Sequence, residues 1–174
     1  MKHILILLTM TQCLFLFSQN SKWTNKEHKL TMEFPSNYED VEKPENVLAW
    51  KYNFENNSSF EVTYSDDYVF SLFDMDDYRE EWSGNKEAQK NALSVLYKDI
   101  SINIWESEYL INDGLVVHGV YSGTLIEENI RRTVATIQFL KNNKLYTVMC
   151  SCNPQEFKTF YKKCRDVYDS ISFF

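Results

Sequence analysis

Glycine and proline are scarce in this sequence, with four and three residues respectively among 174. No low-complexity tract and no internal repeat is visible, so nothing in the sequence marks a linker or a domain boundary. The hydrophobic share of 44% and the charged share of 25% are typical of a globular protein and not of a disordered one. The sequence therefore predicts a single domain after any N-terminal targeting segment.

Positive charge is also sparse and scattered. Eighteen Lys and Arg residues stand against 25 Asp and Glu residues, which gives a formal net charge of −7. The densest basic groups are Arg131-Arg132 and Lys162-Lys163, and no basic stripe interleaved with aromatic residues is present. This balance argues against nucleic acid as a partner.

An apolar run opens the chain. After Met-Lys-His, the residues from Ile4 to Phe17 are mostly apolar, and polar residues follow from Ser18 onward. The run is shorter and more polar in its middle than the roughly 20 apolar residues of a membrane-spanning helix. It predicts a cleavable signal peptide over 1–18 and a mature domain over 19–174, exported to the periplasm or the medium. Cys13 follows Gln12 and not a small residue, so a lipid anchor is not expected.

Aromatic and β-branched runs predict an antiparallel sheet. Residues 30–34 alternate between apolar and polar before Pro35, as in a half-buried strand. The runs 47–54 and 60–64 are joined by a polar segment that suits a hairpin loop. Four further strands are predicted at 102–111, 115–124, 132–140 and 145–152. Asn112-Asp113-Gly114 and Asn142-Asn143 provide their tight turns.

Two helices are predicted beside these strands. The first runs from Ser83 to about Tyr97, and one face would carry Ala88, Ala92, Val95 and Leu96. The second begins with Asn153 as its cap, Pro154 in the first position and Glu156 three residues after the cap. Its apolar face is expected to cover the sheet and consists of Phe157, Phe160, Tyr161, Cys164, Val167 and Ile171.

Three cysteines remain after cleavage of the signal peptide. Cys150 and Cys152 lie two apart on a predicted strand, so they share a face that we expect to be the core. They are poorly aimed at each other for a disulfide. If the last helix runs back over its own strand, Cys164 comes close to Cys150, and a bond between these two is geometrically feasible. The alternative is three buried free thiols.

No motif for catalysis, a metal or a cofactor stands out. Cys-x-Cys with a distant cysteine lacks the usual spacing of a zinc site. His118, on a predicted strand, is interpreted as a hydrogen-bonded core histidine and His28 as a solvated one. An acidic segment runs from Asp66 to Glu81, but Arg79 stands where a calcium-binding EF-hand loop requires Gly. We expect a solvated acidic face there, with a loose calcium site at Asp74, Asp76 and Asp77 as the alternative.

The acidic segment is also rich in aromatic residues. If these side chains are exposed, they form a candidate contact surface for a protein or a ligand. If they are buried, they belong to the core. The five residues are Tyr68, Phe70, Phe73, Tyr78 and Trp82.

Several short patterns resemble a PsbP-like domain. They are Gly114-Leu115 before a strand, Leu145-Tyr146-Thr147-Val148, Asn153-Pro154 with Phe157, and Ile171-Ser172-Phe173, together with the early Phe34-Pro35. The resemblance covers the C-terminal third well and the first strand loosely. It implies an α+β fold, an antiparallel sheet of about six strands packed by helices on its faces as an α/β/α sandwich. Photosystem accessory proteins and a Ran-binding release factor share that fold.

The resemblance implies a binding module and transfers no catalytic residue. We therefore expect an exported, non-enzymatic binding or accessory domain that contacts a protein at the cell envelope, without a cofactor. Two alternatives remain. One is a small-ligand carrier with an apolar cleft between sheet and helix, and the other is a hydrolase with a cysteine or carboxylate centre.

Overall fold

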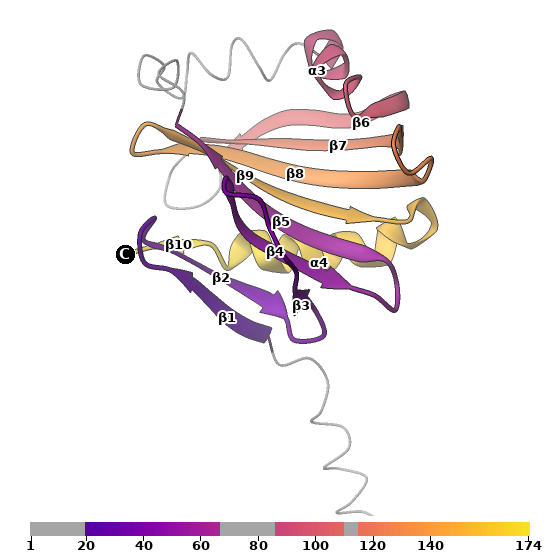
Figure 1. Cartoon of the computed structure of the whole chain (residues 1–174). Coiled ribbons are helices and arrows are strands. Elements are labelled where there is room, and N and C mark those ends of the chain that lie inside the picture. Colours follow the sequence, from indigo (N-terminus) through magenta and orange to yellow (C-terminus); the bar gives the residue numbers. More distant parts are fainter. Residues whose placement is uncertain (1–19, 67–85, 110–114) are drawn as a thin grey trace, which may run out of the picture.

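A seven-stranded antiparallel sheet forms the centre of the molecule (Figure 1). The computed structural model describes residues 20–66, 86–109 and 115–174, so the predicted signal peptide lies outside the described residues. The strand order is β3-β4-β5-β9-β8-β7-β6. The strands are β3 (Glu39–Asp40), β4 (Val47–Asn53), β5 (Ser58–Ser65), β6 (Tyr97–Tyr109), β7 (Leu115–Leu125), β8 (Arg131–Lys141) and β9 (Lys144–Cys152).

Six of these seven strands were predicted from the sequence, and the short β3 is the addition. The predicted hairpin between β4 and β5 is confirmed, with Asn53 opposite Ser58 at its end. The turn at Asn142 and Asn143 is confirmed as well, because both residues have positive φ angles of 53° and 59°. The antiparallel meander β6-β7-β8-β9 follows from these short connections.

A second, smaller sheet of three strands lies beside the first (Figure 1). It is formed by β1 (Asn20–Asn25), β2 (Leu30–Pro35) and β10 (Ser172–Phe173). The strand predicted before Pro35 is thus confirmed as β2. Its side chains Leu30, Met32 and Phe34 are completely buried, because this sheet closes one side of the core.

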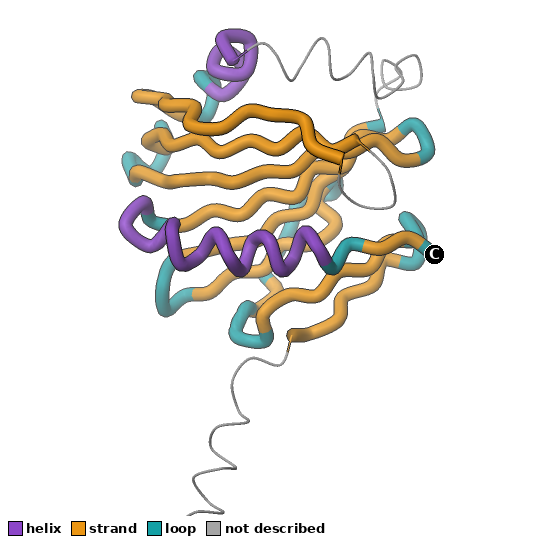
Figure 2. Tube along the Cα trace, turned by 180° about the vertical axis from the view of Figure 1, so that it is seen from behind, coloured by secondary structure: helices purple, strands orange, loops and turns teal. Residues whose placement is uncertain are grey.

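One face of the seven-stranded sheet, here called the core face, is covered by α4 (Phe157–Asp169), as Figure 2 shows. The predicted apolar helix face is confirmed: Phe160, Cys164 and Val167 are buried, and Phe157 and Tyr161 pack against the core. Asn153 is the cap residue and Pro154 the first helical residue, as predicted, but they begin a short 3-10 helix, η3 (Pro154–Glu156), that leads into α4. The Asn153 side chain makes no capping hydrogen bond.

The first predicted helix ends earlier than expected, and its described part buries a different face. Its described part, α3, is Lys86–Leu93, and β6 already begins at Tyr97. Gln89 is buried and Leu93 packs against the sheet, whereas Val95 and Leu96 are 77% and 61% exposed. The predicted face is wrong, because Ala88 and Ala92 lie within α3 and are exposed, and Val95 and Leu96 lie beyond its end.

Candidate functional site

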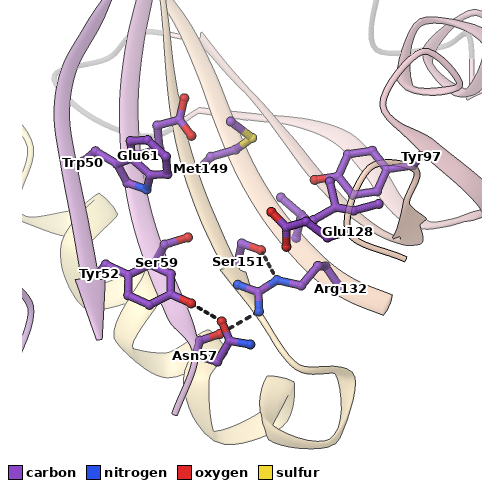
Figure 3. Close-up of a pocket in the computed structure, with 12 residues that line it drawn as sticks. Trp50, Tyr52, Asn57, Ser59, Glu61, Tyr97, Glu128, Arg132, Met149 and Ser151 are labelled. Carbon is purple, nitrogen blue, oxygen red and sulfur yellow. Dashed lines mark hydrogen bonds between the residues drawn. The ribbon is translucent and has the colours of Figure 1, made fainter. Parts of the chain in front are cut away.

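A cavity of about 240 Å³ opens on the other face of the seven-stranded sheet, here called the pocket face (Figure 3). Strands β4, β5, β8 and β9 provide its floor, and the ends of β6 and β7 provide one wall. The lining residues are Trp50, Tyr52, Asn57, Ser59, Glu61, Tyr97, Leu125, Glu128, Arg132, Val134, Met149 and Ser151.

Strand alternation places these side chains together. Residues on one strand point alternately to opposite faces, so Glu61 lies on the pocket face while Phe60 and Val62 are buried in the core. The register sets Trp50 directly opposite Glu61 on β4, and Glu61 opposite Met149 on β9. Glu61 therefore sits in a cross-strand row between an indole and a thioether.

A second row runs parallel to the first. Tyr52 of β4 is opposite Ser59 of β5, Ser59 is opposite Ser151 of β9, and Ser151 is opposite Val134 of β8. The Tyr52 hydroxyl donates a hydrogen bond to Asn57 Oδ1 at the end of the hairpin (Figure 3). This row gives the pocket its hydroxyl groups.

Glu61 is the electrostatically unusual residue of the pocket. Burial raises the pKa of its carboxyl group. Within the part of the chain that the structure describes, this carboxylate has no hydrogen bond and no ion pair. Its oxygen atoms are not sealed from solvent, since no buried side-chain oxygen or nitrogen of the described residues lacks a partner. The negative charge of Glu61 is thus partly desolvated and uncompensated, and it is accessible from the pocket.

Arg132 holds the other side of the pocket in place and is only 6% exposed. Its Nε donates to Ser151 Oγ at 3.0 Å and its Nη1 donates to the Asn57 carbonyl oxygen at 2.7 Å. Both acceptors are neutral, so the guanidinium ties β8 to β9 and to the β4–β5 turn. Figure 3 shows Arg132 and Glu128 on the side of the pocket away from Glu61.

Tyr97 forms the wall near β6, and Gly123 makes room for it. A Cβ atom at position 123 would lie 3.0 Å from the Cβ of Tyr97 and 3.2 Å from its ring. The Tyr97 ring also packs edge-on against Tyr121, with ring centroids 5.5 Å apart. Because position 123 has no side chain, the Tyr97 ring can lie close to β7 and form this wall.

The three cysteines lie on the core face, where the sequence placed Cys150 and Cys152. All three, including Cys164 of α4, are fully buried free thiols, and the Cys164 thiol donates to the Phe160 carbonyl oxygen at 3.4 Å. A bond between Cys150 and Cys164 stays a prediction for the oxidised protein. Labelling of the denatured protein without reductant, followed by intact mass measurement, tests it: one labelled thiol indicates the bond and three exclude it.

The environment of His118 was predicted correctly from the sequence, and that of His28 was not. His118 is buried, and its Nε2 is 3.1 Å from the Tyr161 hydroxyl, which confirms a hydrogen-bonded core histidine. The interpretation of His28 as solvated is wrong. His28 is 7% exposed, its Nδ1 lies 2.9 Å from the Tyr146 hydroxyl, and its ring packs on Tyr64. The turn between β1 and β2 folds back on β9, which the sequence does not reveal.

Other predicted residues fall outside the described ranges. These are the aromatic residues Tyr68, Phe70, Phe73, Tyr78 and Trp82 and the acidic residues Asp74, Asp76 and Asp77. Across 20–66, 86–109 and 115–174, no group of three or more His, Cys, Asp or Glu side chains is arranged to hold a metal ion. No helix in those ranges is long and apolar enough to cross a membrane.

The pocket was not predicted from the sequence, although part of the pattern that forms it is visible there. The alternation in 58–65 separates Ser59 and Glu61 from Phe60 and Val62, and the predicted hairpin brings Trp50 and Tyr52 next to them. The pairing of β5 with β9 could not be foreseen. That pairing joins strands that are about 85 residues apart in sequence and brings Met149 and Ser151 to the site.

Comparison with known proteins finds similarity in fold to several solved structures. No protein-family model matches the chain, and no curated protein matches it. Among solved structures, CyanoP, the cyanobacterial PsbP of Synechocystis, has a TM-score of 0.64 at 13% identity and covers 89% of this chain and 92% of its own. LpqN of Mycobacterium tuberculosis, described as involved in cell envelope biogenesis, has a TM-score of 0.60 at 8% identity, with 90% and 91% covered.

A protein of unknown function from Pseudomonas aeruginosa has a TM-score of 0.51 at 10% identity and covers 85% of this chain and 94% of its own. The domain thus has a PsbP-like α+β fold, as the sequence patterns implied. At these identities the likeness shows the fold alone.

Proposed function

We propose that this protein is an exported, non-enzymatic binding or accessory domain that acts by contact with a protein at the cell envelope, and that the pocket face is its contact surface. The observation that carries this proposal is the pocket flanked by Trp50 and Tyr52, with Arg132 at its base. Tryptophan, tyrosine and arginine are the residues that dominate the binding energy of protein interfaces. Here they come together around one concave site.

Two further observations support the proposal. The apolar run at 4–17 predicts export. LpqN, which shares the fold, is described as a protein of cell envelope biogenesis. Both observations support an exported domain that would meet its partner at the cell envelope.

The alternative of a ligand cleft between sheet and helix is less favoured. Side chains fill the space between α4 and the sheet: Phe60 and Phe160 lie with ring centroids 5.3 Å apart, and Val148, Cys150 and Cys164 are fully buried. The cavity lies on the opposite face and is lined by both polar and apolar side chains. An apolar ligand would therefore have to displace core side chains that are closely packed.

A cysteine hydrolase also has little support. Burial raises the pKa of Cys152 to about 12 and that of Cys164 further, so both thiols stay protonated at neutral pH. The thiolate is the nucleophilic form, and it would not be populated. Glu61 and Glu128 both line the pocket but lie on opposite sides of it (Figure 3), and the lining residues include no histidine that could act as a base for the Ser59 or Ser151 hydroxyl.

Site-specific photocrosslinking in the native host tests the contact surface. A photoreactive phenylalanine analogue replaces Tyr52 in the pocket, and in a matched control it replaces Phe174, an aromatic residue that is 63% exposed. We expect one discrete adduct with an envelope protein from position 52, none from position 174, and loss of the adduct in Trp50→Ala. No adduct from position 52, or the same adducts from both positions, would overturn the proposal.

Export is tested separately by the mass of the protein recovered from the envelope and the medium. Cleavage after Ser18 gives a mature chain that begins at Gln19. Recovery of the uncleaved chain from the cytoplasm alone would contradict the exported state.

A further inference from the structure

We propose that the pocket receives a basic side chain, lysine or arginine, of the partner protein, with Glu61 as its counter-ion and the Trp50 ring beside it. This inference rests on the proposed function, and it names the chemistry that the partner presents.

The first argument is the uncompensated charge of Glu61. The register places this carboxylate between Trp50 and Met149, two large side chains that remove water from it. Among the described residues it has neither a hydrogen bond nor a cationic partner. A carboxylate that is held partly desolvated without compensation is costly to the free protein. A bound cation would remove that cost, so the pocket favours a positively charged group at this point.

The second argument is the aromatic wall. Trp50 is the direct cross-strand neighbour of Glu61, and Tyr52 follows on the same face of β4. The faces of Trp and Tyr rings attract ammonium and guanidinium groups, with tryptophan the best of the aromatic side chains. A cation next to Glu61 would therefore contact both a carboxylate and an indole. Both contacts favour binding of a cation over binding of a neutral group of the same shape.

The third argument is the arrangement of the other charges. Arg132 donates to two neutral oxygens on the far side of the pocket, where Glu128 is also placed (Figure 3). Among the charged residues that line the pocket, Arg132 and Glu128 carry opposite charges, so the negative charge of Glu61 is not balanced. The cavity of about 240 Å³ accommodates one long side chain, and Met149 provides an apolar surface for its methylene groups.

The net charge of the protein agrees with this choice of partner. The chain carries a formal charge of −7, so it attracts basic surfaces and repels acidic ones. An acidic domain with an uncompensated carboxylate, Glu61, beside an aromatic wall is complementary to a basic partner.

Side-chain mimics test the chemistry of the pocket in the mature protein. The probes are the blocked amino acids N-acetyl-lysine methylamide and N-acetyl-arginine methylamide, with N-acetyl-norleucine methylamide as the neutral control and the glutamate analogue as the anionic control. Two-dimensional NMR follows the Trp50 indole N–H and the amides of Glu61 and Met149, and the Trp23 indole serves as an internal reference. We expect saturable shifts with the two basic probes, with dissociation constants on the order of millimolar.

The variant Glu61→Gln keeps the shape and removes the charge. We expect it to weaken binding of the basic probes by about tenfold or more, and added salt to weaken binding to the wild type. Glu33→Gln, which removes an exposed carboxylate on β2, should leave binding unchanged. Equal shifts with norleucine, shifts with the glutamate probe alone, or binding that is indifferent to Glu61→Gln would each overturn the inference.

The same variant separates this inference from the proposed function. In the crosslinking experiment, an adduct at position 52 that survives Glu61→Gln keeps the contact surface and refutes the basic side chain. Loss of the adduct in Glu61→Gln, with retention in Glu33→Gln, supports both. Binding of the basic probes without any adduct refutes the protein partner and identifies the occupant as a free organic cation.

Discussion

The two faces of the seven-stranded sheet are built from the same strands, but they differ in how deeply their side chains are buried and in what covers them. On the core face, Phe60, Val62, Val148 and Cys150 are completely buried under α4 and the small sheet. On the pocket face, the intervening residues Glu61 and Met149 are half-buried around a cavity. The difference shows that each strand contributes to stability through one set of residues and to a candidate site through the other. The two sets can therefore be changed separately.

The largest expected effect is on the core face. Phe160 of α4 is 4% exposed and packs against Phe60 with ring centroids 5.3 Å apart. Phe160→Ala leaves a cavity beneath the helix, and we expect it to lower the free energy of unfolding by about 3–5 kcal/mol. Urea unfolding followed by circular dichroism measures the loss. Trp50→Ala, on the pocket face, is the comparison and should cost much less, because Trp50 is only half-buried; an equal loss would contradict the division between the faces.

The wall of the pocket should be less sensitive than the core. Gly123→Ala brings a methyl group within 3.0 Å of the Tyr97 Cβ, so the strand or the ring must shift. We expect a loss of about 1–3 kcal/mol in the free energy of unfolding, as for other overpacked sites. The same variant should move the NMR resonances of Tyr97 and Tyr121. Wild-type stability with unchanged resonances would mean that Gly123 does not fix this wall.

Glu61 offers a test in which loss of a charge is stabilising. Burial raises its folded-state pKa above the ordinary value of a glutamate, so the protonated form favours folding. The stability that Glu61 contributes is therefore complete at low pH and is lost as the pH rises through the folded-state pKa. We expect Glu61→Gln to unfold at a higher temperature than the wild type at pH 7, with the difference vanishing below pH 4. A less stable variant at pH 7 would indicate that the carboxylate has a partner.

The smallest effect is expected at the edge of the core face, at His28. Burial first, and the charge of Lys144 second, lower its folded-state pKa below 6.5, while Glu27 and Asp66 oppose the shift. Protonation then favours the unfolded state, so stability is complete above pH 6.5 and decreases as the pH falls below it. Thermal unfolding between pH 7.5 and 5 should show a steeper decrease for the wild type than for His28→Gln. Parallel curves would show that His28 does not titrate in this window.

Local patterns predicted the parts of the molecule that local chemistry decides. The alternation before Pro35, the Asn142-Asn143 turn and the apolar face of α4 all depend on neighbours within a few residues, and all are confirmed. The face of α3 was predicted wrongly, because Ala88 and Ala92 are exposed on the helix and Val95 and Leu96 lie beyond its end. The aromatic segment from Tyr68 to Trp82 stays a prediction.

Only part of the candidate site could be predicted, because only some of its residues are brought together by strands that are adjacent in sequence. Hairpin pairing alone puts Trp50 beside Glu61, because β4 and β5 are adjacent in sequence. Met149 and Ser151 arrive through the pairing of β5 with β9, which joins distant parts of the chain, and Arg132 follows because β8 forms a hairpin with β9. His28 was misjudged on similar grounds, since its partner Tyr146 lies 118 residues away.

The sequence by itself determined the α+β class, most of the strands, the final helix and the acidic charge, because hydrophobic periodicity, turn residues and composition are local properties. Only the tertiary structure decided the strand order, the closure of the core by the small sheet, and the meeting of Trp50, Glu61 and Arg132 around one cavity. The physical reason is that strand alternation specifies which residues share a face, whereas long-range pairing specifies which faces become neighbours.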